Sequence, residues 1–172
     1  MALAADLQIR AATAADAESI ADVHFSAVHM LAAGWYSAQV LGTWSPTPSE
    51  ARFRQFRQAI NGGQETVYVA QLAGQAVAFG SLVPASRELR ALYVHASASA
   101  RGIGSALLVR LEAAAAELGC QQLHLSASLN SAGFYRRHGY EAIEQSRHRF
   151  ENGCEMACVK MRKSLAPRCS AA

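Results

Sequence analysis

The sequence lacks the features that mark several large classes of protein. It contains four cysteines, and no two of them form a Cys-x-x-Cys pair, so we expect neither a zinc site nor a disulfide framework. No segment reaches the ~20 consecutive apolar residues that cross a bilayer, and residues 1–10 lack the basic and apolar regions of a signal peptide. These absences predict a cytoplasmic protein with reduced thiols, no metal ion and no membrane partner.

Charge is sparse as well. Only 17% of the 172 residues are charged, and the net charge is +3. The densest basic clusters, at 52–57 and 147–149, could attract a small anion, but they lack the interleaved aromatic residues of a nucleic-acid surface. The hydrophobic content of 51% is ordinary for a globular protein. We therefore expect no nucleic-acid partner and a single domain at 1–165, followed by a flexible tail at 166–172.

Hydrophobic periodicity predicts strands and helices that alternate along the chain. Strands are predicted where apolar residues alternate or run together between turn residues, at 7–11, 66–70, 76–83, 89–94, 122–126, 140–145 and 156–162. Helices are predicted where apolar residues recur every three or four positions, after 13–16, near 37–41, from 47 to 61, at 102–118 and from 130 or 131 to 139. This order predicts an α/β fold with a mixed sheet covered by helices on both faces.

Capping residues mark where two of these helices begin. Thr13 and Asp16 have the spacing of a capping box, so the first helix should follow them. His24 shares the apolar face of that helix, and its default role is that of a core or pocket-wall histidine. Thr47 is the expected N-cap of a later helix, with Pro48 at its first position.

A glycine-containing loop opens the longest predicted helix. Buried strand residues are followed by small residues and then by Arg101-Gly102-Ile103-Gly104. The unpaired N–H groups of the first helical turn and the helix dipole favour a phosphate there, and Arg101 adds positive charge. The alternative is a tight strand-to-helix turn without a ligand. The loop is neither a Walker motif, which needs Gly-Lys-Ser/Thr, nor a Rossmann fingerprint, because Leu107 occupies the position of its third glycine.

Three motifs in sequence order resemble the GNAT superfamily of N-acetyltransferases, and a poorly characterised bacterial subgroup of it in particular. They are the opening segment 9–16, the segment 92–108 with its glycine loop, and the pair 125–128 and 134–140. The resemblance covers nearly the whole chain. It implies a mixed, mostly antiparallel sheet of six or seven strands and direct transfer of an acetyl group from acetyl-coenzyme A to an amine in a ternary complex.

The resemblance also implies which residues bind the coenzyme. Main-chain groups of Leu92, Tyr93 and Val94 would pair with the pantetheine arm like an added strand. Backbone N–H groups of the loop would hold the pyrophosphate, from residues Ala100, Arg101, Gly102, Ile103, Gly104 and Ser105. One departure is Ser99, which stands where the family has Gln or Arg, and it leaves open which side chain assists the phosphates.

Further coenzyme contacts follow from the resemblance. Ser128 falls where many members have an Asn that contacts the coenzyme, and Asn130 lies close enough in the sequence to share that role. The alternative for Asn130 is a helix N-cap. Tyr135 falls on the tyrosine that faces the thioester sulfur, where it would donate a proton or a hydrogen bond to the leaving thiolate. The alternative for Tyr135 is a core position on a short helix.

Acetyl transfer needs a base, because an amine with a pKa near 10.4 is neutral in only about one molecule in 2,500 at pH 7. Glu88 is the candidate, although an ordinary Glu is a poor base unless burial raises its pKa or a water relays the proton. Strand alternation predicts that Glu88 lies on the same side as Leu92. In the histone-acetylating branch of the superfamily the base lies at the corresponding place, fourteen residues before the Gly102 position. The alternative is a solvated Glu between two arginines.

Aromatic residues cluster between the first helices, where members of the superfamily differ. His29, Trp35, Tyr36 and Trp44 are the candidates for the acceptor pocket, and the alternative is that these aromatics are core residues. His138, by contrast, is expected at the surface. The acceptor would be an amine of a small molecule or of a peptide or protein. The resemblance to the superfamily also favours a homodimer.

Two other interpretations stay open. The chain could be a regulatory module that binds acetyl-coenzyme A without catalysis, although the presence of Tyr135 argues against this. It could instead be a nucleotide-binding protein of another kind, which predicts stabilisation by ATP or NAD and none by acetyl-coenzyme A.

Overall fold

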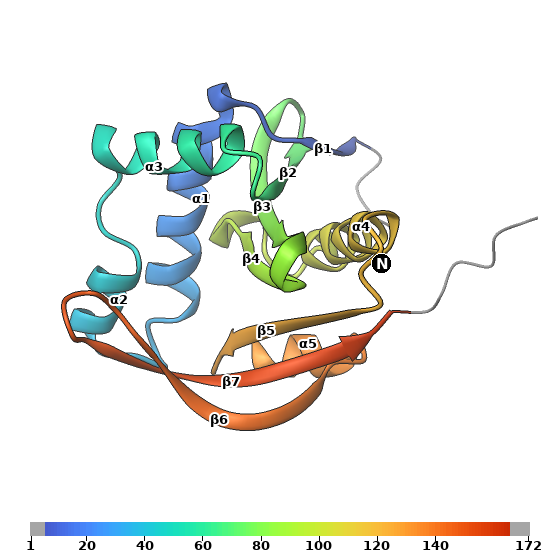
Figure 1. Cartoon of the computed structure of the whole chain (residues 1–172). Coiled ribbons are helices and arrows are strands. Elements are labelled where there is room, and N and C mark those ends of the chain that lie inside the picture. Colours follow the sequence, from blue (N-terminus) through green and yellow to red (C-terminus); the bar gives the residue numbers. More distant parts are fainter. Residues whose placement is uncertain (1–5, 166–172) are drawn as a thin grey trace, which may run out of the picture.

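A computed structural model describes residues 6–165, so the predicted tail at 166–172 lies outside the described residues. One seven-stranded sheet has the order β1-β2-β3-β4-β5-β7-β6, in which β4 and β5 are parallel and the other neighbours antiparallel (Figure 1). The strands are β1 (Leu7–Ala11), β2 (Thr66–Leu72), β3 (Gln75–Val83), β4 (Glu88–Val94), β5 (Gln122–Ser128), β6 (Glu141–Arg149) and β7 (Glu155–Ser164). The prediction of a mixed sheet is confirmed.

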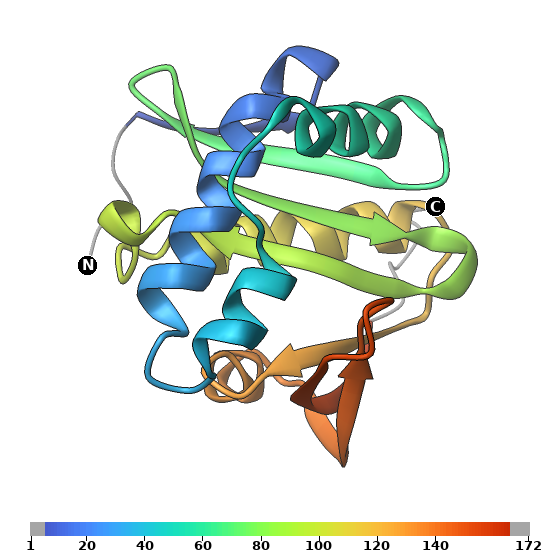
Figure 2. The same cartoon turned by 90° about the vertical axis from the view of Figure 1, so that its left-hand side faces the viewer.

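Helices cover both faces of the sheet, as expected. They are α1 (Ala17–Ser26), α2 (Ala38–Trp44), α3 (Glu50–Asn61), α4 (Ile103–Glu117) and α5 (Ala132–Arg137). Figure 2 looks onto the face crossed by α1, which also carries α3, and α4 lies behind the strands. We call these two sides the α1 face and the α4 face. No helix within residues 6–165 combines the length and hydrophobicity that a membrane span requires.

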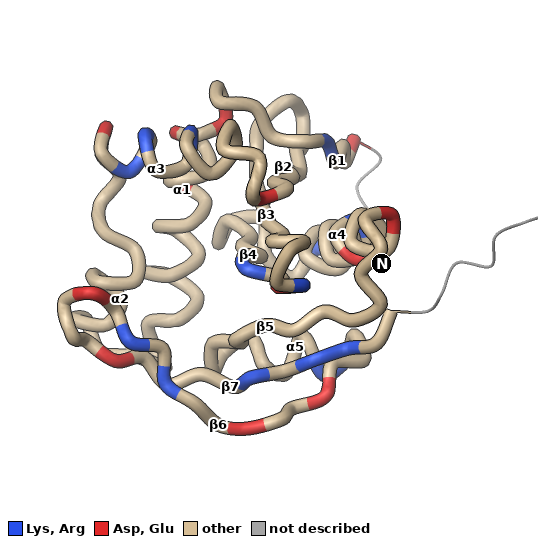
Figure 3. The backbone as a smooth tube through the Cα atoms, in the orientation of Figure 1, with Lys and Arg blue, Asp and Glu red and all other residues tan. Residues whose placement is uncertain are grey.

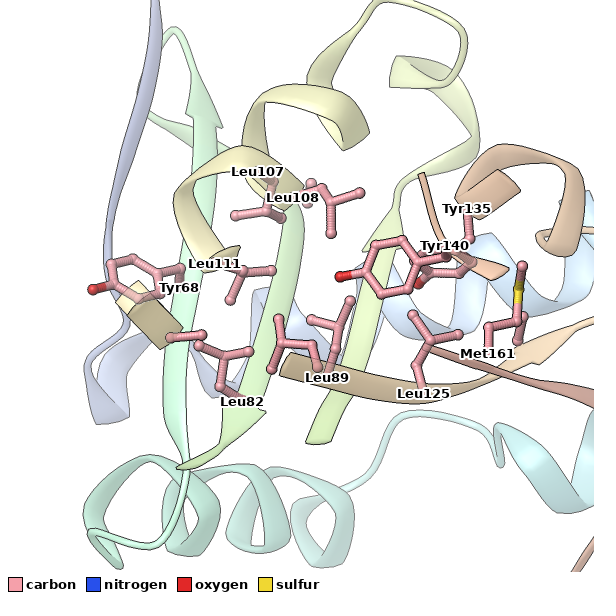
Figure 4. Close-up of a cluster of buried hydrophobic side chains, with 14 of the residues drawn as sticks. Tyr68, Leu82, Leu89, Leu107, Leu108, Leu111, Leu125, Tyr135, Tyr140 and Met161 are labelled. Carbon is pink, nitrogen blue, oxygen red and sulfur yellow. The ribbon is translucent and has the colours of Figure 1, made fainter. Parts of the chain in front are cut away.

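The main core lies on the α4 face. The leucines Leu107, Leu108 and Leu111 of α4 are completely buried there, as their spacing predicts. Figure 4 shows them above β3 and β4, with Tyr135 and Tyr140 packed side by side where the core reaches α5. The core therefore fixes α4, whose N-terminus carries the glycine loop, against the central strands.

The capping residues predict the start of α1 correctly and the start of α3 incorrectly. The backbone N–H and the hydroxyl of Thr13 both donate to the Asp16 carboxylate, at 2.7 and 3.1 Å, and a short 3₁₀ turn leads into α1. The prediction of Thr47 as the next N-cap is wrong. The N-cap of α3 is Ser49, whose hydroxyl accepts from the Arg52 N–H. Thr47 and Ser49 both have the hydroxyl that a cap needs, and the chain uses Ser49, so the helix begins at Glu50 after Pro48.

Strands β4 and β5 separate soon after they meet. Within the described chain they pair only at Glu88 and His124. Beyond that point Leu92–Val94 keeps its partners on β3, but its other edge faces a gap toward β5 rather than a strand. This separation places a strand edge with unused backbone groups in the middle of the sheet.

Candidate active site

A cavity of about 950 Å³ opens where β4 and β5 diverge, and we call it the cleft. Its lining combines the edge of β4, the loop before α4, the end of β5, α5 and the aromatic residues near α2. This volume is at the upper end of the range for small-molecule sites, so the cleft is large enough for an extended ligand.

The loop before α4 is shaped for close approach to its backbone. Ala100 and Gly102 have positive φ angles of 59° and 79°, and α4 begins directly afterwards at Ile103. A Cβ atom built on Gly102 would meet nothing within 4 Å, so open space lies beside that backbone. The first N–H groups of α4 have no earlier carbonyl partners in the helix and form an anion site. Most of the loop lines the cleft, whereas Arg101 is exposed and is not part of the lining.

Gly104 has a packing role rather than a conformational one. A Cβ atom at this position would come within 3.4 Å of Val94 and 3.7 Å of Phe134. The glycine therefore lets α4 start close to both β4 and α5. Ser105, the next residue, donates its hydroxyl toward His138 Nε2 at 3.0 Å, while His138 Nδ1–H donates to the Phe134 carbonyl.

The predicted surface position of His138 is therefore wrong. Its ring is half-buried against Phe134, with ring centroids 4.3 Å apart, and it links α5 to the start of α4. The short sequence Tyr-Arg-Arg-His looks solvated because two arginines precede the histidine, and only the packing of α5 on the loop shows otherwise.

The end of β5 supplies polar groups to the cleft. Ser128 is buried and its hydroxyl lies 2.8 Å from the hydroxyl of Ser131. Asn130 lines the cleft, and its side-chain oxygen Oδ1 is buried without a hydrogen-bond partner. It is not a helix cap, since α5 begins at Ala132 with Ser131 as its N-cap. A buried acceptor without a donor is costly, so Asn130 Oδ1 is suited to a ligand N–H.

Tyr135 lines the cleft from α5 and is only 7% exposed. Burial raises the pKa of its phenol well above the ordinary value of 10. The hydroxyl therefore stays protonated throughout the physiological range and can act as a hydrogen-bond donor. Its ring packs edge-on against Phe134 and Tyr140, which holds the phenol in one orientation.

Glu88 lines the cleft, but the argument that placed it beside Leu92 is wrong. Ser81 of β3 pairs with Ala91, and Leu82 pairs with Leu89, so β4 has one extra residue in a bulge at this point. A bulge reverses the alternation of side chains along the strand. Leu89 thus lies in the core of the α4 face together with Leu92, and Glu88 belongs to the α1 face.

The Glu88 carboxylate is accessible and held by a neighbouring cation. Its side chain is 31% exposed, and Oε2 lies 2.9 Å from Arg90 Nη2. Arg90 Nη1 binds Glu65 Oε1 at 2.6 Å, so a single guanidinium joins two carboxylates. This arrangement fixes the position of Glu88 at the start of β4 and leaves it open to water.

The four acceptor-pocket candidates separate into two pairs. Trp35 and Trp44 line the cleft, and Trp35 is 57% exposed at its mouth. His29 and Tyr36 are not lining residues. His29 Nε2 donates to the Ser45 carbonyl at 2.8 Å. The Tyr36 hydroxyl accepts from the Leu129 N–H at 2.7 Å and donates to the Ala157 carbonyl at 2.8 Å, so it joins the loop before α2 to the turn after β5 and to β7.

Sequence reasoning missed the contribution of the last two strands. His148, Phe150 and Cys158 belong to β6, the turn after it and β7, and all three line the cleft. No motif marks them, because only the pairing of β7 with β5 brings them there. Cys158 is buried, and burial raises the pKa of its thiol.

The paired strands β6 and β7 carry charges of both signs. Figure 3 shows Lys and Arg along β7 beside Asp and Glu along β6, and Lys160 and Glu144 pair there at 2.6 Å. Within residues 6–165 no group of three or more His, Cys, Asp or Glu side chains could hold a metal ion.

Comparisons with known proteins agree with this geometry. The sequence model of the acetyltransferase (GNAT) domain family matches residues 33–165. The Escherichia coli (strain K12) protein described as uncharacterized N-acetyltransferase YafP is 28% identical over 142 residues, 83% of this chain and 86% of that protein. The crystal structure of a GCN5-related N-acetyltransferase from Rhodopseudomonas palustris has a TM-score of 0.85 and 29% identity, over 96% of this chain and 99% of that one.

A further solved structure contains the acetyl donor. It is a phosphinothricin acetyltransferase from Sinorhizobium meliloti in complex with acetyl-CoA, with a TM-score of 0.70 and 24% identity over 94% of this chain and 89% of that one. At this identity the likeness concerns the fold alone.

Proposed function

The chain belongs to the GNAT family of acetyltransferases and is an acetyl-CoA-dependent N-acetyltransferase, and on this premise we propose that the cleft holds acetyl-CoA along β4 while the acceptor amine enters from the α1 face. The observation that carries the proposal is the unpaired edge of Leu92–Val94, next to the loop that opens α4. Acetyl-CoA supplies an acetyl group activated as a thioester.

The residues of the cleft fit this donor. The backbone of Leu92–Val94 offers hydrogen bonds to the amide groups of a pantetheine arm, in the manner of an added strand. The unpartnered Asn130 Oδ1 offers an acceptor for one N–H. The loop from Ala100 to Ser105 offers backbone N–H groups and the open space beside Gly102 for a pyrophosphate. Ser128 completes the polar wall near Asn130.

Two side chains are assigned to the chemistry. Tyr135 donates a hydrogen bond toward the position of the thioester sulfur, because burial keeps its phenol protonated. Glu88 accepts the proton that the amine must lose, directly or through a water, since its carboxylate is open to solvent on the α1 face. Transfer is direct, with acetyl-CoA and the amine bound at the same time in and beside the cleft of about 950 Å³. The acceptor is an amine of a small molecule or of a peptide or protein.

The first experiment is a thermal shift with acetyl-CoA beside coenzyme A, ATP and NAD. A ligand at 100 times its Kd adds about 2.7 kcal/mol, which raises Tm by roughly 2–4 °C or more. Stabilisation by the two coenzyme A species alone supports the proposal, and stabilisation by ATP or NAD instead would contradict it.

A second experiment separates catalysis from binding. The substitution Tyr135→Phe is expected to lower kcat by about 100-fold with an unchanged acetyl-CoA Kd. An unchanged kcat would remove Tyr135 from the chemistry. Turnover of acetyl-CoA by the unaltered protein with a panel of amines also excludes a regulatory module without catalysis.

A further inference from the structure

A second cavity of about 300 Å³ lies on the α1 face, between α3 and the strands β2 to β4. Its walls include the aromatic rings of Phe56 from α3 and Phe79 from β3. Trp44, Arg90 and Tyr93 line both this cavity and the cleft, so the two spaces are neighbours that share one wall. Trp44 Nε1 donates to the Tyr93 hydroxyl at 3.1 Å and closes one part of this wall, whereas Arg90 is 47% exposed, so a molecule that spans the two spaces would pass on the Arg90 side.

Of the two arginines that line this cavity, Arg52 is the one without a carboxylate partner among the described residues. Its guanidinium is half-buried and lies 4.6 Å from the centre of the Phe56 ring. It donates to Gln55 Oε1 at 2.9 Å and approaches His24 Nδ1 at 3.4 Å. Among residues 6–165 no Asp or Glu oxygen forms an ion pair with it. Burial lowers the pKa of the Arg52 guanidinium, which is the direction expected for a desolvated and uncompensated cation.

The other ionisable groups of the cavity do not compensate Arg52. Glu65 lines it, but its carboxylate is bound by Arg90 at 2.6 Å. Burial lowers the pKa of His24 to about 3, so its ring is neutral. Because a guanidinium only donates, His24 Nδ1 is the acceptor and the ring proton lies on Nε2. Arg90 is already compensated by Glu65 and Glu88, so the anion that this cavity favours is one that binds Arg52.

The neighbouring arginines of α3 differ from Arg52. Arg57 pairs with Glu50 at 2.6 Å and lies 3.9 Å from Glu18. Arg54 is exposed and lines neither cavity. Of the three arginines in the basic cluster at 52–57, only Arg52 therefore lies where a bound molecule could contact it.

We propose that the second cavity binds a carboxylate at the far end of the amine acceptor, with Arg52 as its partner. The planar fork of a guanidinium matches a carboxylate in two hydrogen bonds, and the rings of Phe56 and Phe79 would pack on an apolar stem. The acceptor class is accordingly an amine separated from a carboxylate by an apolar chain. This inference rests on the proposed function, since it assumes that the amine lies near Glu88.

The test uses two matched series of acceptors. One series is ω-amino carboxylates of increasing chain length, and the other is the corresponding neutral ω-amino amides. Release of coenzyme A gives kcat/KM for each compound. At the best chain length the carboxylate should exceed its amide by at least about tenfold, because a hydrogen-bonded charge pair is lost in the amide.

Two variants of α3 make the assignment specific. Arg52→Gln should abolish the preference for the carboxylate, chiefly by raising the KM of the carboxylate series, and should leave the thermal shift with acetyl-CoA unchanged. Arg54→Gln, the matched control, should keep the preference. A preference that survives Arg52→Gln, or no preference at any chain length, overturns the inference.

The outcome also separates this inference from the proposed function. If acetyl-CoA stabilises the protein but neither series is acetylated, the inference fails and acetyl-CoA binding stands. If acetyl-CoA gives no stabilisation, the proposed function itself fails.

Discussion

The ion pair of Asp16 with Arg10 predicts a specific acid sensitivity of the fold. The Asp16 carboxylate is 10% exposed and receives both Arg10 Nη1 and Nη2, at 2.8 and 2.7 Å, in addition to the two groups of Thr13. The Arg10 hydrogen bonds, followed by those from Thr13, lower the pKa of Asp16 from 3.8 to about 2. The carboxylate is therefore more stable in the folded protein than in the unfolded chain.

The magnitude follows from this lowered pKa. A fall from 3.8 to about 2 corresponds to at most about 2.4 kcal/mol of stability at neutral pH. Because the Arg10 side chain is 38% exposed, solvent screening reduces this to about 1–2 kcal/mol. A depressed carboxyl pKa stabilises above the unfolded value, so the contribution is complete at neutral pH. It is lost as the pH falls from about 5 to about 2.

Denaturant unfolding from neutral to acidic pH measures this contribution. Asp16→Asn should be about 1–2 kcal/mol less stable than the unaltered protein at pH 7, and the difference should shrink as the pH falls through the window. Asp22, which is 71% exposed on the following helix α1, provides the control, and Asp22→Asn should show no such convergence. If the Asp16→Asn difference is the same at pH 7 and near pH 3, the assigned ion pair does not account for the stability.

Three substitutions test other parts of the structure. Gly80→Ala would place a Cβ 2.6 Å from Leu111 Cδ1 and 2.9 Å from the Ala91 carbonyl oxygen. The free energy of unfolding in urea should therefore fall by about 1–3 kcal/mol, and a fall of less than half of that would show that β3 and β4 shift to make room for the methyl group. Gly102→Ala should lose about 1–2 kcal/mol from its φ of 79°, and calorimetry should show weaker acetyl-CoA binding, whereas an unchanged Kd would place the pyrophosphate elsewhere. Tyr36→Phe leaves two backbone groups without their partner and should lower unfolding stability by about 1–3 kcal/mol; an unchanged midpoint would show that water replaces the hydroxyl.

The architecture was predictable because periodicity and caps act locally. The observed β1, Leu7–Ala11, has the predicted bounds, and α4 begins one residue later than expected. Strands β6 and β7 are longer than predicted because their outer residues are polar and exposed, and the hydrophobic pattern ends before the backbone pairing does. The N-cap of α3 was misplaced because Thr47 and Ser49 are both good capping residues, and the sequence does not decide between them.

The candidate site was predictable only where a contiguous motif carried it. The loop from Ala100 to Ser105 and Tyr135 lie in such motifs, and both line the cleft. Arg52 and Tyr93 are forty-one positions apart in the sequence, and their meeting at one cavity depends on how α3 packs over the sheet. No local pattern contains that information, because the second cavity exists only between elements.

The bulge in β4 explains both the main error at the site and a feature of the proposed chemistry. Alternation without a bulge would place Glu88 with Leu92 on the α4 face, where α4 and the main core lie. The one extra residue moves Glu88 to the α1 face, on the side of Tyr93 and the second cavity. A base on the α4 face would be separated by β4 from an amine that enters from the α1 face. On the α1 face it is adjacent to the wall that both cavities share, so the proposed acceptor can meet Glu88 at its amine and Arg52 at its carboxylate.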